Sequence, residues 1–237
     1  MAKFVRLTLL AVLAVSSAWS EPMIDVGHFG PGGTISSAGL GSVITGSAVR
    51  ISQLMGTGVP QQDGTTFTVG GTAGGYGAMD FVTGIVKSVK NLGSGIWEYA
   101  YDGGGLFTVR GSVAAAGITG NEVLLSGTFY DGKFLVRDTG AGYVVMMQAA
   151  GTDTKNASLL NFFGLPNNEF AFSGFSIAAT VIGELGSTGA FSAIAHSSAI
   201  TNAMVPEPAT MMLIGSGMLF LSACMRRRTR RSADRTS

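Results

Sequence analysis

A short aromatic segment near the middle of the chain holds the residues best suited to binding chemistry. Trp97, Tyr99 and Tyr101 alternate with smaller or polar residues, and alternate residues of a β-strand project to the same face of a sheet. The three rings therefore form a row, and they are candidate ligand-binding residues that could stack against the faces of sugars. The alternative, which we favour, is that they fill the core, because large aromatic side chains contribute the most burial.

Two acids beside this row are the candidates for catalysis. Glycoside hydrolysis needs two carboxyl groups that face each other across a cleft, and Glu98 and Asp102 lie next to the aromatic side chains. However, Asp102 is accounted for by an Asp-Gly-Gly-Gly turn, and Glu98 is expected to point away from the rings. We therefore expect no catalytic residue, and a secreted glycoside hydrolase ranks third among the functions considered.

Other reactive groups are few and scattered. His28 and His196 lie near opposite ends of the sequence, so they do not supply the three or four clustered ligands of a zinc site. The glycine-rich stretch 70–77 is followed by a predicted strand, whereas a phosphate-binding loop requires a helix. Residues 153–156 lack the spacing of an EF-hand, which leaves a looser surface calcium site as an alternative. We expect no metal site and no cofactor.

The charge of the chain is unevenly distributed. Residues 21–205 contain seven basic and twelve acidic residues, a net charge of −5, although the whole chain has +1. This balance argues against nucleic acid as a partner, because such binding requires a concentrated basic surface. The only cysteine, Cys224, lies outside this region, so the body forms no internal disulfide and must be stabilised by packing or by partners.

Turn residues separate short β-branched and aromatic runs along the body. Strands are predicted over 65–69, 79–86, 143–148 and 170–181, with weaker ones between 21 and 58 and a closing strand after 186. We predict one hairpin that joins 96–101 to 106–110 and places Trp97 opposite Arg110 for a cation–π contact. The Asp131-Gly132 pair predicts a second hairpin that joins 123–130 to 133–137.

One helix is expected among these strands. Asp153 or Thr154 is predicted to cap it, Leu159, Leu160 and Phe163 give it an apolar side, and residues 164–166 end it with glycine and proline. The fold class is therefore all-β: an antiparallel β-sandwich or barrel with one short helix, spanning residues 21–204 as a single extracytoplasmic domain.

The first twenty residues have the three parts of a secretory signal peptide. Lys3 and Arg6 form the basic start, residues 7–15 form the apolar run, and 18–20 provide the small residues of a cleavage site. We expect the Sec translocon to export the chain and signal peptidase to cleave it after Ser20. An uncleaved anchor is the alternative, although nine apolar residues are too few to span a bilayer.

The C-terminal segment also has three parts. Pro206, Glu207 and Pro208 precede an apolar run over 209–225, which as a helix of 17 residues would extend about 25 Å, near the thickness of a bilayer core. A basic tail, 226–237, follows. Its arginines are predicted to stay cytoplasmic and so to leave the body on the opposite side of the inner membrane; they are Arg226, Arg227, Arg228, Arg230 and Arg231.

This combination resembles the PEP-CTERM sorting signal of exported proteins in Gram-negative bacteria, over about residues 205–231. The resemblance implies a partner, the exosortase, which is a membrane-embedded cysteine transpeptidase that cuts near the triplet and passes the body to the cell surface or the surrounding matrix. An ordinary uncleaved membrane anchor is the alternative. Because bodies differ widely within this family, the resemblance indicates the route of the protein and not the activity of its body.

Together these features predict a non-enzymatic protein that is transiently anchored in the inner membrane and then released to the cell surface or the extracellular matrix. We expect a structural or adhesive role there, in contact with exopolysaccharide. A carbohydrate-binding module that uses the aromatic row is the second choice.

Overall fold

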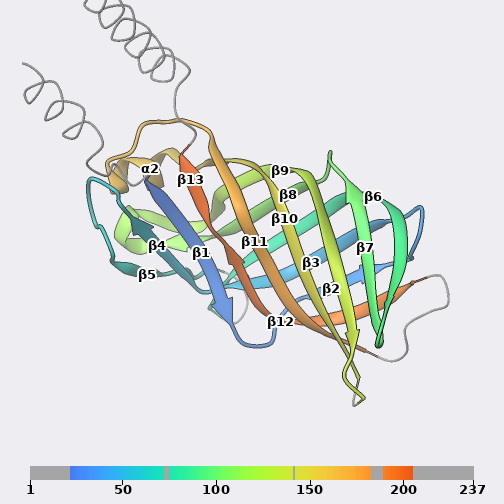
Figure 1. Ribbon diagram of the computed structural model, residues 1–237. Coiled ribbons are helices and arrows are strands. Elements are labelled where there is room, and N and C mark those ends of the chain that lie inside the picture. The colour runs from blue at the N-terminus through green and yellow to red at the C-terminus, as the bar shows by residue number, and fades with distance from the viewer. Residues whose placement is uncertain (1–21, 72–74, 141, 183–188, 205–237) are drawn as a thin grey trace, which may run out of the picture. The chain divides into compact units, whose positions relative to one another are not determined.

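The computed structural model describes residues 22–71, 75–140, 142–182 and 189–204, which form a β-stranded body with one short α-helix (Figure 1). The all-β class is thus confirmed. The strands are β1 (Met23–Phe29), β2 (Thr34–Ser37), β3 (Val43–Ile51), β4 (Gln53–Thr57), β5 (Thr66–Thr68), β6 (Gly77–Gly93), β7 (Ile96–Asp102), β8 (Leu106–Val113), β9 (Ile118–Asp138), β10 (Tyr143–Lys155), β11 (Phe170–Val181), β12 (Phe191–Ile200) and β13 (Asn202–Met204).

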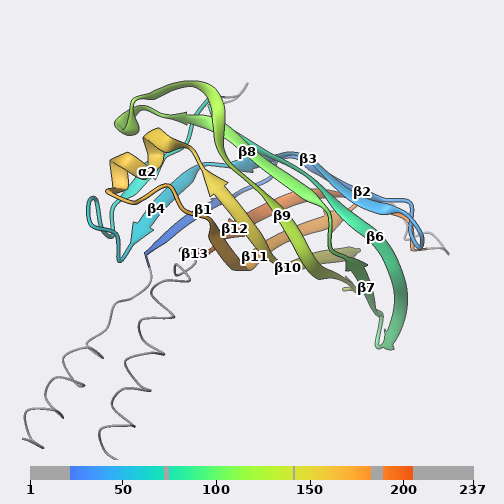
Figure 2. The ribbon, with the colours of Figure 1, turned by 90° about the horizontal axis from the view of Figure 1, so that it is seen from above.

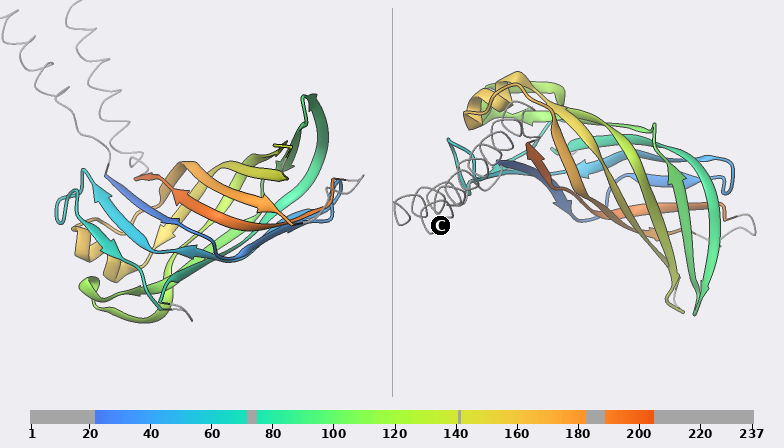
Figure 3. Two further views of the ribbon diagram at one scale, coloured as in Figure 1. Left: turned by 90° about the horizontal axis from the view of Figure 1, so that it is seen from below. Right: turned by 45° about the horizontal axis from the view of Figure 1, so that its top comes forward.

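The described strands pair in an antiparallel manner and close into a ring. Hydrogen-bonded neighbours follow the order β10–β9–β7–β6–β3–β2–β12–β11, and β11 then pairs with β10. Strands β1, β13, β4 and β5 extend one end of this ring. The views in Figure 3 show how strongly the strands twist and coil, which is the consequence of the right-handed twist of each strand.

The first predicted hairpin is wrong. Strands β7 and β8 do not pair with each other; instead both pair with β6 on one side and with β9 on the other, one after the other along the sheet. Trp97 lies opposite Asn91 and Val136, and Arg110 lies opposite Ala78. The expected contact between Trp97 and Arg110 is therefore absent, because the glycines after Asp102 interrupt a long strand without reversing it.

The second predicted hairpin is wrong for a similar reason. Strand β9 runs through Asp131 and Gly132 without turning, and Phe134 pairs with Tyr99 and not with Phe129. A Cβ atom on Gly132 would lie 2.0 Å from the hydroxyl oxygen of Tyr101. The glycine is thus required because another side chain passes close to the backbone, and its presence beside an aspartate does not signal a turn.

Aromatic side chains fill the middle of the interior. Phe129 is at its centre, with ring centroids of Phe107, Phe172 and Phe175 at 5.4, 5.9 and 5.0 Å. These rings come from β8, β9 and β11, so strands that are distant in sequence meet through them. Buried alternate residues continue this apolar core along the strands, and burial of this kind is the main favourable term in folding.

The predicted helix is confirmed, but its cap is two or three residues later than expected. Helix α2 spans Ala157–Phe163, and the side chain of Asn156 accepts a hydrogen bond from the backbone N–H of Ser158 at 2.9 Å. Strand β10 continues up to Lys155 and so includes both predicted caps. The ring of Phe67 on β5 lies 4.9 Å from that of Phe162 on α2, and Figure 2 shows the helix beside β4.

Candidate functional site

The aromatic row lies on the inner side of β7. Tyr99 and Tyr101 are 0% and 4% exposed, and the ring of Trp97 packs edge-on against Tyr143 at 6.2 Å. Burial raises the pKa of Tyr99 to about 12 and also raises the pKa of Tyr101. The rings of Tyr99 and Tyr101 thus belong to the core, and the row presents no flat surface on which sugars could stack.

The two candidate catalytic acids point outward from the same strand, as expected for Glu98. Each has its own basic partner: Glu98 lies 3.8 Å from Lys133, and Asp102 lies 2.5 Å from Lys87. Four residues along a strand separate the two acids by about 13 Å, which is more than the carboxyl separation in either class of glycosidase. The two acids therefore do not form the pair that this hydrolysis requires.

The two histidines lie on neighbouring strands, although they are far apart in the sequence. His28 on β1 pairs with Ser198 on β12, two residues from His196. His28 is buried, with both ring nitrogens unpartnered, whereas His196 is exposed. Burial, with a smaller effect of the charge on Arg50, lowers the pKa of His28. No group of three metal-binding side chains occurs among the residues that the structure describes.

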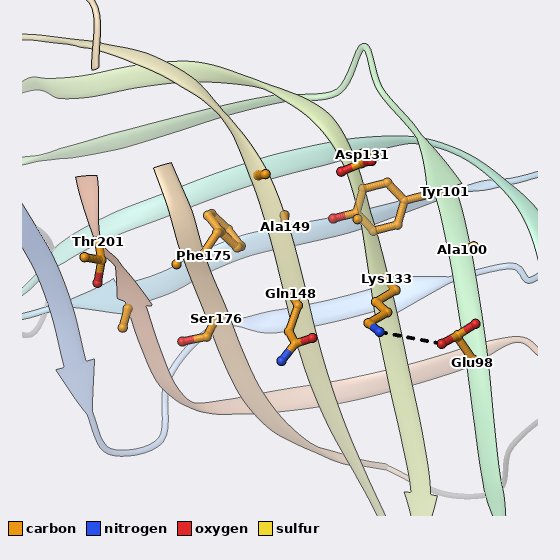
Figure 4. Close-up of a pocket in the computed structure, with 14 residues that line it drawn as sticks. Glu98, Ala100, Tyr101, Asp131, Lys133, Gln148, Ala149, Phe175, Ser176 and Thr201 are labelled. Carbon is orange, nitrogen blue, oxygen red and sulfur yellow. Dashed lines mark ion pairs between the residues drawn. The ribbon is translucent and has the colours of Figure 1, made fainter. Parts of the chain in front are cut away.

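A hollow of about 880 Å³ lies on the outer face of the sheet, across β7, β9, β10, β11 and β12 (Figure 4). Its polar side chains come from four strands and from the residue between β12 and β13: Glu98, Asp131, Lys133, Gln148, Ser176 and Thr201. Three of them form a transverse line, because Lys133 pairs with Gln148 and Gln148 pairs with Ser176. The register of the sheet thus brings together polar groups that the sequence keeps apart.

Small residues and irregular pairing explain why this face is hollowed. The line continues at both ends into alanines, since Lys133 pairs with Ala100 and Ser176 pairs with Ala199. The register of β10 shifts between Ala149 and Gly151, and such bulges increase the local twist and bend of a strand. Short side chains on a bent surface leave space above them, and longer polar side chains surround that space.

A buried hydroxyl lies behind the floor of the hollow, on the inner side of the sheet. Tyr101 and Gly132 both line the hollow, but the tyrosine oxygen lies against the inner side of the glycine, where a Cβ would be only 2.0 Å away. This oxygen is buried and has no hydrogen-bond partner. Such a group is rare, because an unsatisfied buried hydroxyl carries a desolvation cost of about 1–3 kcal/mol.

A buried ion pair lies inside the body, toward the end that carries α2. Nζ of Lys155 is 2.5 Å from Oδ1 of Asp153 and 3.9 Å from the ring centre of Phe170, and both charged side chains are fully buried. Burial raises the pKa of Asp153 and lowers the pKa of Lys155, while their mutual attraction opposes both shifts. The sequence had suggested a cap or a calcium ligand for Asp153, and the structure places it in the core.

Neither the hollow nor the ion pair was predicted from the sequence. The hollow depends on which residues face each other across four pairings, and no local pattern reveals that register. The ion pair had a weak signal, since Asp153 and Lys155 alternate at the end of a strand whose other inward residues are apolar.

A comparison with protein families identifies the C-terminal segment. Residues 205–228 match the family model of the PEP-CTERM protein-sorting motif, so the resemblance stated from the sequence is confirmed for this segment. The match includes Pro206, Glu207 and Pro208. The motif implies that the protein is exported, anchored in a membrane and then sorted to the surface by an exosortase. Among curated proteins and among solved structures, no match was found.

Several predicted segments lie outside the described residues. They are the signal peptide 1–20, the apolar run 209–225 and the basic tail 226–237. Within the part of the chain that the structure describes, no helix is both long and apolar enough to cross a membrane. The compact unit of the body ends at Met204, and a second unit begins at Val205, the first residue of the sorting motif.

Proposed function

We propose that this protein is a non-enzymatic component of the cell envelope or the exopolysaccharide matrix, where its β-rich body has a structural or adhesive role. The observation that carries the proposal is the sorting motif at residues 205–228, which begins where the compact body ends. A sorting signal at this boundary allows the exosortase to separate the body from the segment that anchors it.

The body suits such a role. Its interior is filled by aromatic and aliphatic side chains, and its ring of pairings gives most strands a partner on both sides, which limits edge-to-edge aggregation. The stability of the body does not depend on an internal disulfide, because Cys224, the only cysteine of the sequence, lies outside the body. The outer hollow provides a recessed polar surface for contact with other matrix components.

The route to the surface follows from both termini. We propose export through the Sec translocon, cleavage by signal peptidase after Ser20 and a transient inner-membrane stage in which residues 209–225 span the bilayer. The arginines from Arg226 onward then stay cytoplasmic and the body faces outward. An exosortase acts on the triplet from this topology.

Intact-mass measurement of surface material tests the route. We expect a species that begins near Glu21 and ends near Pro206. A chain in which residues 206–208 are replaced by alanine should keep its C-terminal segment and stay with the membrane fraction. Recovery of surface material that still carries Arg226 would refute the cleavage step.

The role of the body has its own test. Deletion of the gene should reduce biofilm cohesion and alter surface texture, and full-length chain supplied from a plasmid should restore both. An unchanged biofilm together with normal sorting of the wild-type chain would contradict a structural or adhesive role and leave the route intact.

A further inference from the structure

We propose that the outer hollow is a binding site for a neutral, hydroxyl-rich glycan chain, and that it is the place where the body contacts matrix polysaccharide. The inference rests on the proposed surface role and gives it a specific site. It differs from the carbohydrate-binding alternative suggested by the sequence, because the ring row of Trp97, Tyr99 and Tyr101 lies on the inner side of β7 while the hollow lies on the outer side of the sheet.

The dimensions of the hollow suit a chain better than a single sugar. It extends from β7 to β12, and four inter-strand spacings of about 4.8 Å give a width of about 19 Å. Figure 4 shows Glu98, Lys133, Gln148 and Ser176 arranged one after another across these strands. A ligand that lies across the strands would meet each of these side chains in turn.

The chemistry of the lining favours hydroxyl groups. Gln148 offers an amide donor and acceptor, and Ser176 and Thr201 offer hydroxyls that both donate and accept. Sugar hydroxyls also donate and accept, so they match such neutral groups without requiring a net charge. The alanine and glycine floor allows a ring to approach the backbone closely.

Other ligand classes fit less well. The one basic residue of the lining, Lys133, is paired with Glu98, and Asp131 adds a second acid, so an anionic polymer would meet net negative charge. The large apolar residues of the lining, Tyr101 and Phe175, are buried, so the hollow has no apolar side pocket to anchor a peptide. Strand addition is also excluded here, because the crossed strands already have partners on both sides.

Affinity electrophoresis with the full-length chain in mild non-ionic detergent tests this proposal. The gels contain dextran, galactomannan, mixed-linkage β-glucan or, as the anionic polymer, alginate. We expect at least one neutral polysaccharide to retard the wild-type protein. Ser176→Trp should abolish the retardation, because the indole fills the hollow, and Thr180→Trp should preserve it. Both residues are exposed on the outer face of β11, and Thr180 is outside the lining.

A milder variant distinguishes the loss of a binding contact from the loss of the fold. Gln148→Ala removes one polar group without adding bulk and should weaken the retardation by about tenfold, while Met146→Ala on the same strand should not. Circular dichroism confirms that each variant is folded. The proposal is overturned if no neutral polysaccharide retards the wild type, if alginate alone does so, or if the tryptophan at 180 abolishes retardation as fully as that at 176.

These outcomes are separable from the proposed function. A Ser176→Trp chain that is sorted and released normally but no longer binds glycan leaves the route intact and confirms the site. A wild-type chain that binds glycan but is never released to the surface confirms the site and refutes the proposed route.

Discussion

The inner and outer faces of the same strands use their residues in opposite ways. On the inner face of β9 and β11, Phe129, Phe172 and Phe175 pack ring against ring. On the outer face of the same region, small residues such as Ala150 and Gly174 leave a hollow edged by polar groups. Strand alternation sets both patterns, so the difference lies in side-chain size: one face is filled for stability and the other is left open for contact.

Ion pairs occur on both faces of the described strands, and the inner pair differs in burial from the outer pair of Glu98 and Lys133. Asp153 and Lys155 are fully buried inside, whereas Glu98 and Lys133 are 23% and 47% exposed outside. Removing charges from water costs several kcal/mol per ion, and an exposed pair incurs little of this cost. The inner pair is therefore the place where a single substitution should matter, and the outer pair is free to change its contacts with a ligand.

The largest effect is expected from the centre of the inner face. Phe129→Ala would leave a cavity among the rings of Phe107, Phe172 and Phe175, and should lower the free energy of unfolding by about 4 kcal/mol. Denaturation with urea measures this change. Tyr130→Phe, at the next position but on the exposed face, is the matched control and should change stability by less than about 0.5 kcal/mol. Equal losses in both variants would contradict the assignment of faces.

The inner ion pair should come next. Lys155→Met leaves Asp153 buried without its partner and should lower the free energy of unfolding by about 3 kcal/mol. This loss is near the lower end for breaking a buried ion pair, because burial already raises the pKa of the Asp153 carboxyl, which can therefore take up a proton. The double variant Asp153→Leu, Lys155→Met removes both charges and should recover most of the loss.

The outer ion pair provides the control for this experiment. Lys133→Met breaks the exposed pair with Glu98 and should change stability by less than about 1 kcal/mol. Urea denaturation of the three variants gives the comparison directly. A double variant that is no more stable than Lys155→Met would show that the inner pair is needed as a pair and is not merely tolerated.

The sequence revealed the elements of the fold better than their connections. Alternation and turn residues identified the β class, the strand 170–181 and the helix near 157–163. Both predicted hairpins are wrong because Asp102 and Asp131, although each is followed by glycine, do not mark a reversal of the chain. In the structure Gly132 allows close packing against the side chain of Tyr101, and Gly103 allows close packing against the backbone of Tyr130. Both contacts come from elsewhere in the chain, so the local sequence does not reveal them.

The candidate site was harder to predict for a related reason. The sorting motif is contiguous, so its residues were found directly in the sequence. The hollow joins Lys133, Gln148 and Ser176 through strand register, and register depends on bulges that composition does not show. The aromatic row was recognised, but its face could be decided only once the inside of the closed sheet was known.

A third prediction tests the contact between Gly132 on β9 and the side chain of Tyr101 on β7. Gly132→Ala would place a methyl group against Tyr101 and should destabilise the protein by about 2 kcal/mol through overpacking. Gly120→Ala on the same strand meets only the side chain of Glu122, at 3.8 Å or more, and should be nearly neutral. Thermal unfolding of both variants checks the difference. A harmless Gly132→Ala would mean that the residue serves the turn predicted from the sequence.

The smallest effect is a gain in stability at the inner face. Tyr99 has a buried, unpartnered hydroxyl, and burial raises its pKa from 10.0 to about 12. The folded state holds this proton more tightly than the unfolded state does. The contribution of the protonated hydroxyl to folding stability is therefore complete below pH 10 and is lost as the pH rises through 12. Tyr99→Phe removes both the unsatisfied oxygen and this titration, so it should stabilise the protein by about 1 kcal/mol at pH 7. It should also reduce the loss of stability between pH 10 and pH 12.

Urea denaturation at pH 7, 10 and 11.5, with Tyr130→Phe on the exposed face as the control, measures both effects. If Tyr99→Phe instead destabilised the protein at pH 7, the hydroxyl would have a partner in solution, and the inner face would be more polar at this position than its packing indicates.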